Sequence, residues 1–346
     1  MISPRDMAKR QLNLITHRIH TLPVLVLMPH SSCNCRCVMC DIWKANQTQQ
    51  QLSPAILQAH LALFQKWGVR WVTLSGGEPL LHKNLWDFCQ LLKSLKIKIT
   101  LLSTGLLLQR HAESVVRWCD EVIVSLDGSR EIHNRIRNIP NAYDKLAAGV
   151  AALRHIHPDF RVTGRTVLQQ QNFRDLPEII RSAHAIGLDQ ISFLAADVST
   201  EAFNRPELWD EERSAIVALC PAEVPEFANI VEQVIADFAP DFECRYIAES
   251  PDKLRQLPRY YGALLGQNPF PPVTCNAPWV SAVIEAGGTV RPCFFHPSLG
   301  NIHDAPLDEI LNHETAIQFR KHLQTGADPI CEKCVCSLNL GIRTAL

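Results

Sequence analysis

The order of apolar and amphipathic segments constrains the fold of this chain more than any other feature of its sequence. Between residues 24 and 196, short apolar runs alternate with stretches whose apolar residues recur at helical spacing. The apolar runs, which we expect to be strands, cover residues 24–28, 71–74, 97–102, 121–126, 161–168 and 190–195. The helices expected between them cover residues 53–67, 84–95, 107–118, 141–156 and 174–187. This alternation predicts a parallel α/β sheet, either open or closed into a partial barrel.

The sequence after residue 196 departs from this alternation. Further helices are expected near residues 207–219, 222–238 and 306–324. Apolar runs on both sides of Gly287-Gly288, over 279–285 and 289–291, predict a β-hairpin. We therefore expect four parts, namely an N-terminal extension over 1–22, a partial barrel over 23–200, a helical connecting segment over 201–270 and a small α+β domain over 271–346.

Charge and hydropathy exclude several classes of partner. The net charge is −1, and the lysines and arginines are scattered, so nucleic acid is not an expected partner. A membrane helix needs roughly 20 apolar residues in a row, and no such run is present. The apolar run over 22–29 follows a charged N-terminus but leads into cysteines rather than a signal-peptide cleavage site. We therefore expect a cytoplasmic protein.

The cysteines are numerous and unevenly distributed. Of 13 in total, four lie between residues 33 and 40 and five between residues 275 and 336. Thiols so close together in the chain bridge each other poorly, and no export signal is present, so both groups are expected to bind metal. The isolated Cys89, Cys119, Cys220 and Cys244 are expected to be small buried apolar side chains.

Three cysteines of the first group have a spacing suited to an iron–sulfur cluster. Cys33, Cys37 and Cys40 form C-x3-C-x2-C in the loop after the first expected strand. Three thiolates hold three irons of a [4Fe-4S] cube and leave the fourth iron open to another ligand. Zinc is the alternative, although it usually takes four protein ligands.

A second motif follows the next expected strand directly. In Gly76-Gly77-Glu78-Pro79, the glycines allow backbone to approach a ligand closely, and a glutamate can accept hydrogen bonds from an ammonium group. The two motifs in this order resemble the radical S-adenosylmethionine (radical SAM) superfamily over residues 24–196, which implies a partial (β/α)6 barrel. The resemblance implies that Cys33, Cys37 and Cys40 bind the catalytic cluster and that Cys35 is a spare.

The same resemblance implies a set of SAM contacts. Gly76, Gly77, Glu78 and Pro79 would hold the amino group of SAM. Ser125 and Arg137 would contact its carboxylate, and Ser103, beside Thr104, would offer a further polar contact.

The second group of cysteines resembles a twitch domain, the shorter relative of the SPASM domain. By this resemblance, Cys275, Cys293, Cys331 and Cys334 bind an auxiliary [4Fe-4S] cluster, and Cys336 could replace one of them. Structural zinc is the alternative for four such cysteines. His296, three residues after Cys293, could lie behind the cluster ligands, although a surface loop is the favoured position.

The implied function is that of a radical SAM enzyme. A donor such as flavodoxin or ferredoxin would reduce the cluster, SAM would be cleaved to a 5′-deoxyadenosyl radical, and the radical would abstract hydrogen from a substrate. We expect a small-molecule or lipid-like substrate and a net oxidation or rearrangement. A peptide maturase is the alternative, made less favourable by the short segment before the barrel, and a non-catalytic electron carrier is a third possibility. Candidate substrate contacts are Asp197, Asn204, Arg205, Tyr246 and Glu249.

Overall fold

The structure is a computed structural model that describes residues 2–205 and 207–346. Its strands form one sheet in the order β6-β5-β4-β3-β2-β1-β7-β8-β9. The strands are β1 (Val24–His30), β2 (Trp71–Gly76), β3 (Lys98–Ser103), β4 (Glu121–Ser125), β5 (Arg161–Leu168), β6 (Gln190–Ala195), β7 (Ser281–Ile284), β8 (Thr289–Arg291) and β9 (Gly300–Asn301). The first six are parallel and neighbour one another in chain order, which confirms the six expected strands.

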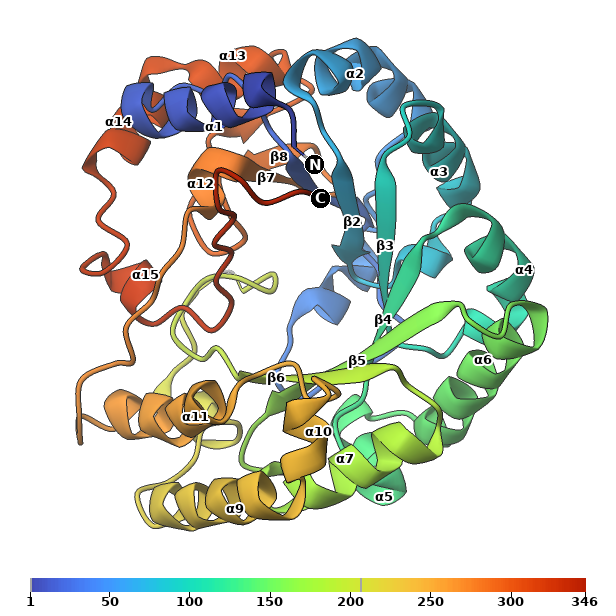
Figure 1. The fold of residues 1–346 in the computed structure, drawn as a ribbon, viewed down its shortest axis with the longest axis vertical. Coiled ribbons are helices and arrows are strands. Elements are labelled where there is room, and N and C mark those ends of the chain that lie inside the picture. Colours follow the sequence, from blue (N-terminus) through green and yellow to red (C-terminus); the bar gives the residue numbers. More distant parts are fainter. Residues whose placement is uncertain (1, 206) are drawn as a thin grey trace.

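Helices cover the outer side of this curved sheet (Figure 1). The helices are α1 (Pro4–Thr16), α2 (Pro54–Trp67), α3 (Leu85–Ser94), α4 (Leu108–Trp118), α5 (Arg130–Arg137), α6 (Ala142–Ile156), α7 (Leu176–Ala185), α8 (Glu211–Ala215), α9 (Glu223–Asp237), α10 (Ala239–Glu243), α11 (Pro251–Leu264), α12 (Ala277–Val280), α13 (Leu307–Asn312), α14 (Glu314–His322) and α15 (Pro329–Glu332). β6 and β9 end the sheet on its two sides, so it is not closed, and the expected partial barrel is confirmed.

Local sequence signals explain where the barrel helices begin and end. Ser53 caps α2 by accepting a hydrogen bond from the backbone N–H of Ile56 at 3.3 Å, and Pro54 is the first helical residue. Gly68 ends α2 with φ +66°, a conformation that costs glycine little. The same helix buries Phe64 and Trp67 in the hydrophobic core, so α2 is placed by its apolar face.

The C-terminal strands join the barrel sheet. β7 pairs in parallel with β1, and β8 pairs antiparallel with β7, which confirms the predicted hairpin. Strands that are far apart in the sequence, β1 and β7, are therefore neighbours in the sheet. The helix expected over 306–324 is two helices, because His313 lies in an extended conformation (φ −59°, ψ 153°) between α13 and α14.

Several elements differ from expectation. The N-terminal extension contains α1, whose buried Arg10 donates to the backbone oxygens of Gly341 and Thr344 at 3.0 and 2.7 Å. α1 therefore lies beside the C-terminal segment (Figure 1). The helix expected over 207–219 is only α8, and α5 and α11 were not expected. Among the described helices, none combines the length and apolar character required to cross a lipid bilayer.

Candidate functional site

The cysteine loop after β1 is held by two neighbouring elements. The Asn46 side chain exchanges two hydrogen bonds with the backbone of Cys33, at 2.8 and 2.9 Å. The backbone N–H of Val38 donates to the carbonyl of Ile136 in α5, at 3.3 Å. The loop that carries Cys33, Cys37 and Cys40 is thus fixed between its own continuation and α5.

Donor groups surround the sulfur atoms of this loop. Cys37 Sγ accepts from Arg137 Nη1 at 3.5 Å, and Cys40 Sγ accepts from the backbone N–H of Ile42 at 3.4 Å. The neighbouring Cys35 thiol and the Arg137 cation together lower the pKa of Cys37 to about 7, although burial opposes this shift. A loop of thiols with N–H donors and a cation beside it suits a cluster that carries negative charge.

Arg137 links this loop to the end of β4. Its guanidinium forms a buried ion pair with Asp127, which lies two residues beyond Ser125. Burial raises the pKa of Asp127, and the Arg137 cation opposes that rise. The Arg137 Nε lies buried without a hydrogen-bond partner among residues 2–205 and 207–346. Ser125 ends β4 half-buried at the same edge of the sheet, and the SAM contacts expected of Ser125 and Arg137 stay predictions.

The glycines of the turn after β2 are required by packing against the cysteine loop. A Cβ on Gly77 would lie 2.0 Å from the carbonyl oxygen of Ser32, and one on Gly76, at φ +101°, would lie 2.8 Å from Met28 Cβ. The backbone N–H of Glu78 donates to the same Ser32 oxygen at 2.8 Å. The close approach expected from the Gly-Gly pair is therefore made, in this structure, to the chain's own loop.

The Glu78 side chain forms hydrogen bonds within the chain, to the loop after β3 and to its own turn. Its carboxylate is buried and accepts from the backbone N–H of Leu80 at 3.2 Å and of Thr104 at 2.7 Å, and the SAM contact expected of Glu78 stays a prediction. The hydroxyls of Ser103 and Thr104 also donate to this carboxylate, so the Ser103 hydroxyl is engaged in a hydrogen bond within the chain. Burial raises the pKa of Glu78, and these donors oppose that rise. Glu78 therefore ties the loop after β3 to the turn after β2.

The substitution Glu78→Gln tests whether these hydrogen bonds of the carboxylate stabilise the folded protein. Both carboxylate oxygens accept from backbone N–H groups, so an amide NH2 would face one of these donors. We expect the substitution to lower the free energy of unfolding by about 1–3 kcal/mol, as for a buried donor left unsatisfied. Urea unfolding would measure it, with the exposed Glu201→Gln as the control. Equal stability of the two variants would contradict the structural role of Glu78.

The second group of cysteines gathers at a separate place in the C-terminal segment. Burial, together with the charges of Cys275 and Cys336, raises the pKa of Cys293 to about 11. Burial, with a contribution from the same two thiols, raises the pKa of Cys334 to about 12. The thiols of this segment therefore influence one another, and Cys331 Sγ lies within 4.8 Å of ligand atoms of His296 and Asp328.

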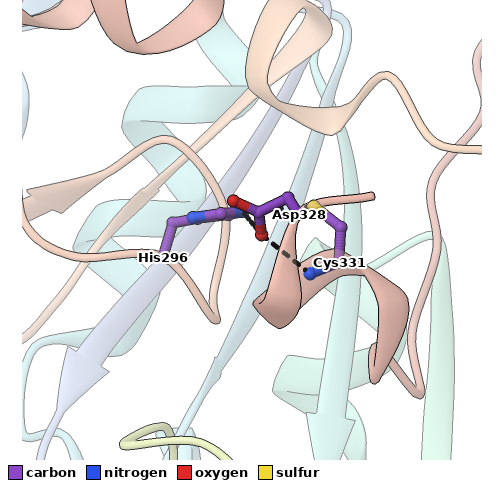
Figure 2. A group of neighbouring side chains, drawn as sticks. All are labelled: His296, Asp328 and Cys331. Atoms are coloured by element: carbon purple, nitrogen blue, oxygen red, sulfur yellow. Dashed lines mark hydrogen bonds and ion pairs between the residues drawn. The ribbon is translucent and has the colours of Figure 1, made fainter. Parts of the chain in front are cut away.

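His296 belongs to this second group, and its expected position in a surface loop was wrong. Its side chain is buried, and Nε2 lies 3.2 Å from Cys331 Sγ and 3.8 Å from Asp328 Oδ1 (Figure 2). The sequence offered one signal for this position, namely the spacing of three residues from Cys293.

A cavity of about 430 Å³ lies where the Gly-Gly turn, the connecting segment and the C-terminal strands meet. Its walls include Gly76, Gly77, Asn204, Arg205, Arg291 and Phe294. A larger, more open cleft of about 1320 Å³ lies between α1 and α13, and the Gly-Gly turn is not part of its wall. Because Gly76 and Gly77 line the smaller cavity, that cavity is the better candidate for a reaction site.

Two of the candidate substrate residues line this cavity, and the others do not. Asn204 and Arg205 lie on its wall. Arg205 is nevertheless committed to a fully buried ion pair with Asp197, at 2.7 Å, which fixes the connecting segment.

Tyr246 and Glu249 have structural roles. The Tyr246 ring stacks on His184 of α7 with centroids 3.8 Å apart, and Glu249 Oε2 accepts from the backbone N–H of Phe193 in β6 at 3.0 Å. Among the isolated cysteines, Cys89 and Cys119 are buried as expected, whereas the expectation was wrong for the exposed Cys220 and Cys244.

Comparison with protein families accounts for both cysteine groups. Residues 27–183 match the radical SAM superfamily, and residues 275–335 match the iron-sulfur cluster-binding domain SPASM. The chain carries a radical SAM domain followed by a SPASM domain. These domains imply SAM and two [4Fe-4S] clusters as cofactors.

Several curated proteins are similar to this chain in sequence. "Fe-coproporphyrin III synthase" of Methanosarcina barkeri is 25% identical over 98% of this chain and 88% of its own length. "AdoMet-dependent heme synthase" of the same organism is 26% identical over 76% of this chain and 75% of its own. "GTP 3',8-cyclase" of Chlorobaculum tepidum is 30% identical over 42% of this chain and 46% of its own.

Solved structures share the fold. Streptococcus suis SuiB bound to S-adenosylmethionine superposes with a TM-score of 0.63 at 12% identity, over 95% of this chain and 75% of that chain. The likeness supports the parallel sheet with a SPASM domain at its C-terminal end.

Proposed function

We propose that this chain is an oxidoreductase in which Cys33, Cys37 and Cys40 hold a catalytic [4Fe-4S] cluster with one iron open to SAM. When bound, SAM and the reduced cluster supply a 5′-deoxyadenosyl radical that removes a hydrogen atom from the substrate, for a net oxidation or rearrangement. The protein residues bind and orient the reactants and exclude water. A donor of the flavodoxin or ferredoxin type supplies the electron.

The observation that carries this proposal is that the Gly-Gly turn, the C-terminal strands and the segments on both sides of the cysteine loop line one cavity. The cysteine loop packs on the turn through Ser32 and Gly77, and Gly77 and Phe294 both line the cavity. In barrels of parallel strands, reaction sites lie at the carboxyl ends of the strands, which is where both motifs stand.

The proposed contacts to the cofactors follow from which groups of the site are already engaged in hydrogen bonds within the chain. Because the Glu78 and Ser103 side chains bond to each other, the turn Gly76 to Pro79 would hold SAM through its backbone. Ser125 and Arg137 would act from the end of β4 and from α5. Cys275, Cys293, Cys331 and Cys334 would hold the auxiliary cluster.

We propose a tetrapyrrole as the substrate class. The support is that two relatives matched over three quarters or more of this chain are named for heme or coproporphyrin synthesis. The relative named for a GTP cyclisation matches less than half of the chain. A tetrapyrrole is also a small molecule, as expected from the sequence.

The test is anaerobic turnover of the reconstituted, dithionite-reduced chain with SAM and a panel of candidate substrates. The panel would contain iron tetrapyrroles with acetate and propionate side chains, GTP and a cysteine-containing peptide. We expect a tetrapyrrole to increase 5′-deoxyadenosine formation and to change in mass. An increase with GTP or peptide alone would overturn the substrate class. No SAM cleavage with both clusters intact would favour an electron carrier.

A further inference from the structure

His296 lies beside one cysteine sulfur atom of the C-terminal segment and influences a second. Its imidazole Nε2 lies 3.2 Å from Cys331 Sγ, in α15 (Figure 2). Burial raises the pKa of Cys293, and the backbone N–H groups of Phe295 and His296 oppose that rise. The direct contact of the His296 side chain is therefore with Cys331.

The imidazole is held in this position from several sides. With 2% of its surface exposed, His296 is closed off from water. The Phe319 ring packs edge-on against it with centroids 4.9 Å apart, and Arg291 Nη1 donates to the His296 carbonyl at 3.1 Å. On the other side, Asp328 Oδ1 accepts from the backbone N–H of Cys331 at 3.0 Å and so fixes the first turn of α15. The contact between Nε2 and Sγ is therefore built into the packing.

The number of cysteines in this segment indicates that His296 donates a hydrogen bond to a ligand and is not a ligand itself. A [4Fe-4S] cube takes four protein ligands, and this segment already offers five cysteines whose thiols influence one another. A neutral imidazole with its proton on Nε2 can donate to Cys331 Sγ without a change of charge. Such a bond strengthens as the thiolate gains charge, so it stabilises the reduced form of a cluster.

We propose that His296 donates a hydrogen bond from Nε2 to Cys331 Sγ and thereby raises the reduction potential of the auxiliary cluster. The inference rests on the proposed second cluster. His296 is a positioning residue here, acting through Cys331. It makes the auxiliary cluster a better acceptor for one electron.

The test is a potentiometric titration of the auxiliary cluster, followed by its electron paramagnetic resonance signal. The full chain with Cys33, Cys37 and Cys40 replaced by alanine isolates that signal, and the same comparison in the wild-type background guards against misfolding of that variant. His296→Leu removes the donor, and His296→Gln keeps an N–H at a similar distance. His322→Leu, an exposed histidine in α14, is the matched control.

We expect His296→Leu to lower the equilibrium constant for one-electron reduction about tenfold, which is about 59 mV. His296→Gln and His322→Leu are expected to stay near wild type, with unchanged iron content. Equal potentials in all four proteins would overturn the inference, and so would loss of the auxiliary irons in His296→Leu, which would make His296 a ligand. Absence of a second cluster in the wild type would overturn the proposed function as well, whereas a potential shift without SAM cleavage would overturn the proposed function alone.

Discussion

Replacing Cys33, Cys37 and Cys40 together with alanine is expected to abolish 5′-deoxyadenosine formation and to lower iron from about eight to about four per chain. The physical reason is local, because three thiolates on one loop hold three irons, and the remaining iron has no protein ligand to retain it. The loop is tied to the Asn46 side chain and to the backbone of α5 by hydrogen bonds, so we expect the barrel itself to fold without the cluster.

The matched control is the double variant Cys220→Ala/Cys244→Ala. Both thiols are exposed and isolated from the two groups, so iron content and SAM cleavage should match the wild type. Iron, sulfide and zinc would be counted in each anaerobically purified protein. Zinc in place of iron, or iron that the triple variant retains in full, would show that the first cysteine group is not the catalytic cluster.

The barrel strands were predictable because their signal lies in the sequence around each of them. A buried parallel strand is a continuous apolar run, and the helices that cover it repeat apolar residues at helical spacing. The helices that escaped prediction lack this signal. α5 buries His133 and Arg137 alongside Ile136, so its buried face is largely polar, and α11 carries Pro258 in its interior.

α1 also lacks a local sequence signal that would have predicted it. It buries Arg10 and Asn13, polar residues that sequence patterns assign to the surface. Asn13 Nδ2 donates to the carbonyl of Trp279 at 2.7 Å, across more than 260 residues of chain. Burial of such a side chain depends on a partner that no local pattern reveals.

The candidate site was likewise predictable only in part from the sequence. The cysteine spacings and the Gly-Gly pair are local, so the sequence placed both loops at the ends of β1 and β2. The roles of single side chains depended on distant partners. Glu78 meets Thr104 after β3, and His296 meets Cys331, and neither pairing follows from spacing alone.

Arg137→Met is expected to lower the free energy of unfolding by about 3–5 kcal/mol, because it leaves the carboxylate of Asp127 buried without its partner. It would also remove the cation beside Cys37 Sγ, so we expect the catalytic cluster to assemble less completely. Urea unfolding of the cluster-free protein would measure the first effect, and iron counting after reconstitution the second.

A second substitution separates lost charge pairing from lost packing. If the unpaired charge dominates, Arg137→Met/Asp127→Leu should recover much of the stability, because removal of both partners leaves no buried charge. Arg135→Met is the matched control on the same helix, because Arg135 is exposed and lies two residues before Arg137. A double variant no more stable than Arg137→Met would assign the cost to packing around α5. A single variant as stable as the control would mean that the buried pair contributes nothing to holding the cysteine loop against the end of β4.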